Sequence, residues 1–151
     1  MKRLLLLLTT FAIISNTLAG IKQSLLKDSL NLSKYDIVIS FNSICCGPPS
    51  DNFLHEFVDS FNNKNRVHIT GWQLGSCGRE GESKILFTVK GLKKIAAKRF
   101  IKSIKKSVSE QNNKNKMINE SSGEIIIEYN ISFKDISNCR GTLQSFYTAK
   151  K

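Results

Sequence analysis

The residues with the most direct chemistry in this chain are its four cysteines. Cys45 and Cys46 are adjacent, Cys77 lies in a glycine-rich stretch, and Cys139 lies near the C-terminal end. Four cysteines allow three pairings into two disulfides. We set aside the pairing that joins Cys45 to Cys46, because it requires a strained ring and a distorted peptide. The first interpretation is therefore two ordinary disulfides that stabilise a small domain.

A thiol site is the alternative interpretation of the same cysteines. Soft metals such as Cu(I) prefer thiolate ligands, and the candidate ligands are Cys45, Cys46 and Cys77. Redox chemistry of the thioredoxin type uses a Cys-x-x-Cys motif, which this sequence does not contain. The alternative therefore predicts a metal-binding or redox protein that uses the Cys45-Cys46 loop.

The stretch that follows Cys46 also has the features of an anion site. Ser50 and Asp51 are good N-cap residues for a helix. The free N–H groups at such a helix start carry the positive end of the helix dipole. Arg79, in the glycine-rich stretch, could clamp a carboxylate, phosphate or sulfate. Ser50, Asp51 and Arg79 are therefore the candidate ligand-binding residues.

The histidines do not indicate catalysis. His55 and Glu56 open a sequence like a zinc-protease motif, but Asp59 stands where the second histidine belongs. His68 has no serine nucleophile motif beside it. We therefore expect a protein that is not an enzyme and that needs no cofactor.

Hydrophobic periodicity predicts the elements that position these residues. Alternating apolar residues predict four strands, over residues 35–42, 67–74, 84–90 and 124–133. Apolar residues at helical spacing predict two helices, one after Asp51 and one from Leu92 to about Ser109. An Asn-Asn-Lys-Asn tetrapeptide follows each helical pattern, at 62–65 and 112–115, and is interpreted as its polar terminator.

The order of these elements predicts the fold. A β-α-β-β-α-β chain over residues 35–133 is typical of a ferredoxin-like α+β two-layer sandwich, a four-stranded antiparallel sheet with both helices on one face. We expect the strand order 4-1-3-2. Residues 20–34 form an N-terminal arm. The tail, residues 134–151, either adds a short edge strand or lies loose.

This topology brings two loops to the same end of the sheet. The loop Asn42–Asp51 and the hairpin Gly75–Glu82 should meet there, so we expect any ligand site at that end. A disulfide from Cys45 or Cys46 to Cys77 is then the favoured pairing. Cys139 reaches the remaining cysteine only if the tail folds back along the sheet.

The position of Cys45 and Cys46 resembles that of the metal-binding cysteines in heavy-metal-associated ferredoxin-like domains. Those domains hold a Cys-x-x-Cys pair after the first strand, at the start of a helix. The resemblance is one of position alone, since the two cysteines here are adjacent. It implies a soft-metal site at this loop.

The outer face of the sheet is a further candidate surface. An apolar row should cross it and could dock a partner protein or a second copy: Val38, Trp72, Leu86 and Ile126. RNA-binding domains of related topology stack bases on aromatic residues of the first and third strands. The outward residues of those strands here are Val38, Ser40, Leu86 and Thr88, so we expect no nucleic-acid partner.

The first nineteen residues have the pattern of a secretory signal peptide. Lys2 and Arg3 precede a short apolar run, and small residues end at Ala19. The apolar run is too short to span a bilayer. Cleavage after Ala19 would give a secreted or periplasmic protein with no transmembrane segment.

The chain is strongly basic, with a formal net charge of +11, or near +9 once Lys2 and Arg3 leave with the signal. An anionic ligand or surface is one interpretation, and solubility together with a lysine-rich coding bias is the other. The expected second helix concentrates cations on its polar face, at Lys94, Lys98, Arg99, Lys102, Lys105 and Lys106. The sequence as a whole predicts an exported, disulfide-stabilised binding or structural module.

Overall fold

The computed structural model describes residues 34–118, 123–136 and 139–147. The expected signal peptide, residues 1–19, and the arm that follows it up to residue 33 lie outside the described residues. Within the described ranges, no helix has the length and apolar character needed to cross a membrane.

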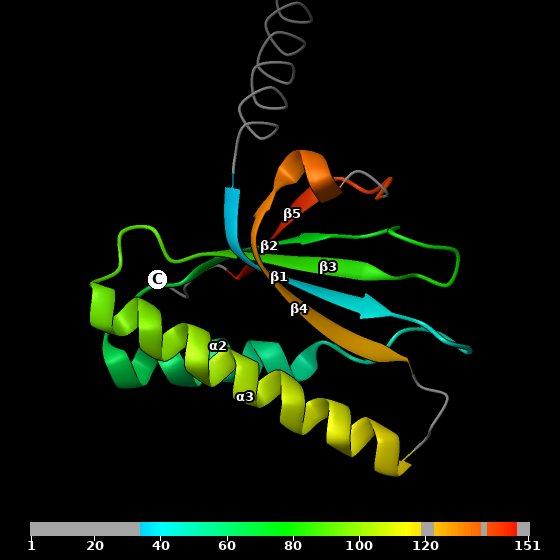
Figure 1. Cartoon of the computed structure of the whole chain (residues 1–151), viewed down its shortest axis with the longest axis horizontal. Coiled ribbons are helices and arrows are strands. Elements are labelled where there is room, and N and C mark those ends of the chain that lie inside the picture. The colour runs from blue at the N-terminus through cyan, green and yellow to red at the C-terminus, as the bar shows by residue number, and fades with distance from the viewer. Residues whose placement is uncertain (1–33, 119–122, 137–138, 148–151) are drawn as a thin grey trace, which may run out of the picture.

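The described chain forms one antiparallel sheet with two helices on one of its faces (Figure 1). The elements are β1 (Lys34–Asn42), α2 (Asn52–Asn65), β2 (Thr70–Leu74), β3 (Ser83–Thr88), α3 (Lys94–Ile118), β4 (Glu124–Ser132), a 3₁₀ turn η1 (Phe133–Ile136) and β5 (Leu143–Tyr147). The sheet order is β4-β1-β3-β2-β5. The expected order of the first four strands is confirmed. The expected count of four is wrong, because the tail adds β5 beside β2.

The main core lies between the sheet and the helices. β1 alternates as predicted, with Ile37, Ile39 and Phe41 buried beneath the helices. The helices contribute buried residues at helical spacing: Leu54, Val58 and Phe61 from α2, and Phe100, Ile104 and Val108 from α3. Phe100 is fully buried at the centre of an aromatic group, with ring centroids 5.1 Å from Phe61 and 5.7 Å from Phe87.

Helix α3 continues well past its expected end near Ser109. The Asn-Asn-Lys-Asn tetrapeptide lies inside the helix, because Asn112 bonds to the backbone of the edge strand β4. Its Nδ2 donates to Ile125 O at 2.8 Å, and Ile125 N donates to its Oδ1 at 3.0 Å. In the first tetrapeptide, Asn62 Oδ1 accepts from Ile69 N at 3.1 Å. Asn112 thus joins α3 to β4, and Asn62 joins α2 to the residue just before β2. These tertiary bonds outweigh the weak helix propensity of Asn.

A second apolar cluster lies on the sheet face away from the helices, beneath η1 (Figure 1). Val38 and Leu86 are fully buried in it, so the apolar row expected to be open is covered at these positions by the chain's own tail. Ile136 is buried there, and the partly buried residues around the cluster are Trp72, Cys77, Ile131, Phe133, Cys139 and Leu143. Ile126, by contrast, is 40% exposed.

The end of β4 departs from the predicted alternation. Continuing the alternation of Ile125 and Ile127 would put Ile131 and Phe133 on the helix-facing side, but both pack in the outer cluster, and Tyr129 is exposed. Asn130, between Tyr129 and Ile131, has a φ of 57°. This left-handed backbone interrupts the regular strand, so the residues that follow it change face.

Candidate functional site

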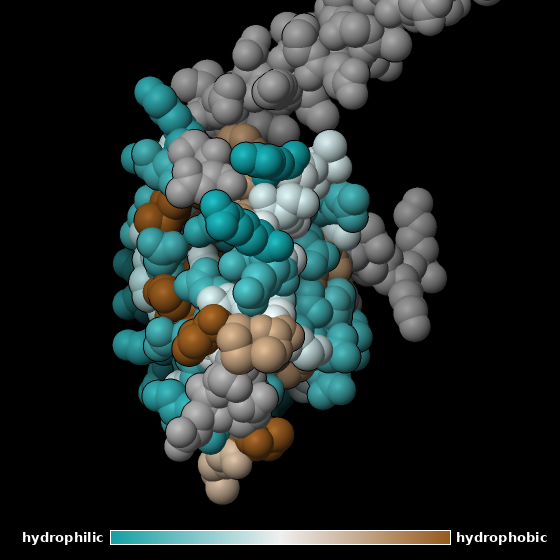
Figure 2. All heavy atoms as spheres, turned by 90° about the vertical axis from the view of Figure 1, so that its right-hand side faces the viewer, coloured by the Kyte–Doolittle hydropathy of each residue, from teal (hydrophilic) through white to brown (hydrophobic). Residues whose placement is uncertain are grey.

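The two loops expected to meet at one end of the sheet are in direct contact. The Ser43 hydroxyl donates to Glu80 Oε2 at 2.5 Å, and Gly47 N donates to the same oxygen at 3.4 Å. Gln73 Nε2, on β2, donates to Asp51 Oδ2 at 3.1 Å. The convergence of the loop 42–51 with the hairpin 75–82 is therefore confirmed. This end of the molecule presents a mainly hydrophilic face with separate hydrophobic side chains (Figure 2).

The disulfide at this end joins Cys77 to Cys139. The favoured pairing of Cys77 with Cys45 or Cys46 was wrong. The tail does fold back along the sheet, and as it approaches β2 it brings Cys139 to the hairpin. Gly141 N donates to Gly75 O at 3.1 Å, and a Cβ at Gly141 would lie 2.5 Å from that oxygen. Only glycine permits this close approach.

Cys45 and Cys46 retain thiol groups, and their Sγ atoms lie 3.1 Å apart. Cys46 is exposed and Cys45 is half-buried. The pKa of the Cys46 thiol is raised, first because Cys45 hydrogen-bonds to it and would repel its negative charge, and then through desolvation and the charge of Glu80. A raised pKa keeps Cys46 protonated at neutral pH. Because only the thiolate is nucleophilic, this lowers the reactivity of Cys46.

The three-cysteine metal set is not assembled, because the sulfur of Cys77 is bonded to Cys139. Among the residues that the structure describes, no group of three or more His, Cys, Asp or Glu side chains is arranged to bind a metal ion.

The start of α2 satisfies its own polar groups. Asn52 N donates to Ser50 Oγ at 3.3 Å, and Leu54 N donates to Asp51 O at 2.9 Å. The Asp51 carboxylate makes no side-chain cap, because it faces Gln73 instead. Arg79 is exposed on the hairpin. The expected ligand residues thus lie at the converging end, where Asp51 and the neighbouring hairpin carboxylates reduce the attraction for a free anion.

Glu80 is a residue of this site that the sequence analysis missed. Its carboxylate accepts from Gly47 N, so an acidic side chain of the protein lies against the loop that leads to the expected anion site. Its own N–H donates to Glu82 Oε2 at 2.9 Å. Two glutamates within the glycine-rich hairpin were the available signal, since a carboxylate on a flexible hairpin can reach the N–H groups of a facing loop.

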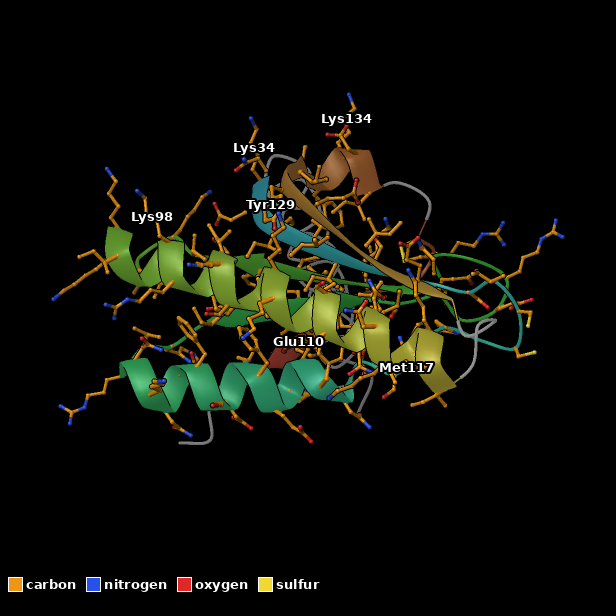
Figure 3. The ribbon with its side chains drawn as sticks, turned by 60° about the horizontal axis from the view of Figure 1, so that its bottom comes forward. Lys34, Lys98, Glu110, Met117, Tyr129 and Lys134 are labelled. Carbon is orange, nitrogen blue, oxygen red and sulfur yellow. A yellow bond between two sulfur atoms is a disulfide. The ribbon has the colours of Figure 1, made fainter. Side chains whose placement is uncertain are left out.

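A second site that the sequence analysis missed lies at the opposite pole. A surface pocket of about 530 Å³ is formed where α2 ends and where the chain passes from β3 to α3. It is lined by Asn65, Arg66, Val67, His68, Lys90, Gly91, Leu92, Lys93 and Ala96, none of which is acidic. Lys98 extends outward from the first turns of α3 (Figure 3). Two basic segments, residues 64–66 and 90–94, were the available sequence signal. Each lies at a turn at this end of the molecule.

The backbone at this pocket is shaped by two left-handed residues. Arg66 caps α2 with a φ of 52°, and Gly91 turns the chain with a φ of 88°. Helix α3 begins directly after Lys93, so the positive end of its dipole adds to the side-chain charges. The pocket therefore combines three cationic side chains, those of Arg66, Lys90 and Lys93, with a helix start.

Comparison with known proteins gives no match: no family model, no curated protein and no solved structure is similar to this chain.

Proposed function

We propose that this protein is an exported, disulfide-stabilised binding module with a ferredoxin-like core that the tail extends by a fifth strand. The N-terminal sequence supports export, and the Cys77–Cys139 disulfide suits an oxidising compartment. We propose further that it acts by binding and has no catalytic activity of its own.

Export has a direct test. We expect protein recovered from the host that makes it to begin at Gly20, because Thr17, Leu18 and Ala19 provide a small-residue cleavage site. Mass spectrometry of the intact protein and of its N-terminal peptide measures this. A mature pool that still begins at Met1 would contradict the proposal.

The ligand we propose is a small multivalent anion that carries phosphate or sulfate groups. The observation that supports it is the pocket of about 530 Å³, whose lining has three cationic side chains, Arg66, Lys90 and Lys93, and no carboxylate. Clustered cations beside a helix start attract such a group more strongly than scattered surface lysines do. The expected site at the cysteine end is a weaker candidate, because the Glu80 carboxylate binds to the adjacent loop there and would repel an anion.

The double variant Lys90→Ala/Lys93→Ala should weaken binding of inorganic pyrophosphate about tenfold, or about 1.4 kcal/mol, because two of the lining cations are lost. Calorimetric titration at low salt measures the affinity, and added salt should lower it for the parent protein.

The matched control is Lys102→Ala/Lys105→Ala, which removes the same charge from exposed positions of α3 outside the pocket. It should change the affinity less than twofold if the pocket is the site. Equal losses in the two double variants would show that only net charge matters. Absence of measurable binding by the parent at millimolar pyrophosphate would also contradict the proposal.

A thiol-based function remains the second candidate, and one observation favours it: the 3.1 Å separation of the Cys45 and Cys46 sulfurs. It concerns the other end of the molecule and does not depend on the anion pocket.

A further inference from the structure

The loop after β1 turns two adjacent cysteine side chains toward each other. Neighbouring side chains point to opposite faces in a strand and do not face each other in a helix. Here Cys46 has a φ of 68° and Gly47 a φ of 99°, and the two sulfurs lie 3.1 Å apart. A left-handed non-glycine residue costs about 1–3 kcal/mol, so the surrounding structure must stabilise this conformation.

Glu80 provides that stabilisation from the facing hairpin. One oxygen of its carboxylate accepts from Ser43 Oγ on one side of the cysteine pair and from Gly47 N on the other. Glu80 itself is positioned by its N–H bond to Glu82. The hairpin is in turn joined to the tail by the Cys77–Cys139 disulfide. The two thiols are thus held between two anchored points of the loop.

The sulfur separation favours a covalent bond over metal binding. A disulfide bond is about 2.05 Å long, so the sulfurs need to approach by about 1 Å. A tetrahedral ion with metal–sulfur bonds of about 2.3 Å needs its sulfurs about 3.8 Å apart, so they would have to separate. The third cysteine of the expected ligand set is also unavailable, since Cys77 is bonded to Cys139.

We propose that Cys45 and Cys46 form a reversible dithiol–disulfide couple that exchanges electrons with external disulfides. Ring strain argues against this pairing in an extended chain. In the folded loop, the left-handed turn and the Glu80 bonds already meet part of the conformational requirement for the ring.

The reaction has two exchange steps. Cys46, which is exposed, first loses its proton to solvent, and its thiolate attacks one sulfur of a disulfide oxidant such as glutathione disulfide. A mixed disulfide forms, and one glutathione leaves and takes up a proton. Cys45, after losing its proton to solvent, attacks the Cys46 sulfur and closes the ring, and the second glutathione leaves. The pair loses two electrons, and one glutathione disulfide is reduced to two glutathione thiols.

The test uses full-length protein in which thiol counting finds two alkylatable cysteines, Cys45 and Cys46. After treatment with glutathione disulfide we expect no alkylatable thiol and a mass lower by about 2 Da. Peptide mapping should locate the new bond between Cys45 and Cys46 and leave Cys77–Cys139 intact, and mild reduction should restore both thiols. A lasting glutathione adduct, a disulfide-linked dimer or two thiols that remain alkylatable would overturn the proposal.

Three variants test the mechanism. Cys45→Ser should accumulate the glutathione adduct on Cys46, because the closing thiol is missing. Glu80→Gln keeps an oxygen acceptor and removes a charge that contributes, after Cys45 itself, to the raised pKa of Cys46, so the first exchange step should be at least as fast as in the parent. Glu80→Ala loses the acceptor and should close at least threefold more slowly than Glu80→Gln. Equal rates for these two variants would overturn the role of Glu80. Pyrophosphate binding, measured on the same samples, reports on the anion pocket separately.

Discussion

Replacing Cys77 and Cys139 together with alanine should lower the free energy of unfolding by roughly 4 kcal/mol, because the disulfide closes a loop of 62 residues. It also holds the tail against the outer face of the sheet, where Val38, Leu86 and Ile136 are buried. A tail released from the hairpin would expose part of this cluster. Both effects lower the free energy of unfolding of the variant.

Urea unfolding of the parent and the variant measures the loss, and a hydrophobic dye should bind the variant more strongly under native conditions. The matched control is Cys45→Ala/Cys46→Ala, which also removes two cysteines but breaks no disulfide. This control should differ from the parent by less than about 0.5 kcal/mol. If both double variants lose the same stability, the bridge does not stabilise the domain.

Phe100→Ala should lower the free energy of unfolding by about 3–5 kcal/mol, since it leaves a cavity at the centre of the main core. The Phe100 ring is fully buried and lies 5.7 Å from Phe57, 5.1 Å from Phe61 and 5.7 Å from Phe87, centroid to centroid. It therefore connects both helices to the sheet. A domain of this size has about 5–15 kcal/mol of stability in total, so this single change removes a large part of it.

Equilibrium unfolding in urea measures this loss as well. Phe53→Ala is the matched control, because Phe53 is a phenylalanine at the edge of the same core and is only partly buried. We expect it to lose less than half as much. A Phe100→Ala variant no less stable than Phe53→Ala would contradict the central place of Phe100 in the core.

The two ends of the sheet differ in charge and in chemistry. The cysteine end brings the Glu80 carboxylate to the loop that carries Cys45 and Cys46. The opposite pole gathers Arg66, Lys90 and Lys93 around an open pocket. Since the sheet separates the two sites, the proposed thiol couple and the proposed anion site can be altered independently by mutation. Separate experiments can therefore test the thiol couple and the anion site.

The sequence predicted the elements that depend on local pattern. The alternation in β1 and the helical spacing in α2 and in the first half of α3 each lie within a few consecutive turns or residues, so periodicity alone identifies them. The order β-α-β-β-α-β then restricts how the strands can pair, and it brought the loop 42–51 to the hairpin 75–82. The last part of α3 was missed, because Asn112 favours a turn locally and is retained in the helix by its bonds to Ile125.

Contacts between residues far apart in the chain were decided only by the tertiary structure. The sequence by itself predicted the first four strands, helix α2, the first half of α3 and the end of the fold where Cys45, Cys46 and Cys77 lie. It could not choose the partner of Cys77, because that choice depends on how a tail 62 residues away packs against the sheet. The Glu80 bonds and the basic pocket arise in the same way, from side chains on separate segments that approach only when the core forms. Periodicity reports which face of an element is buried, whereas packing of the whole chain determines which side chains meet.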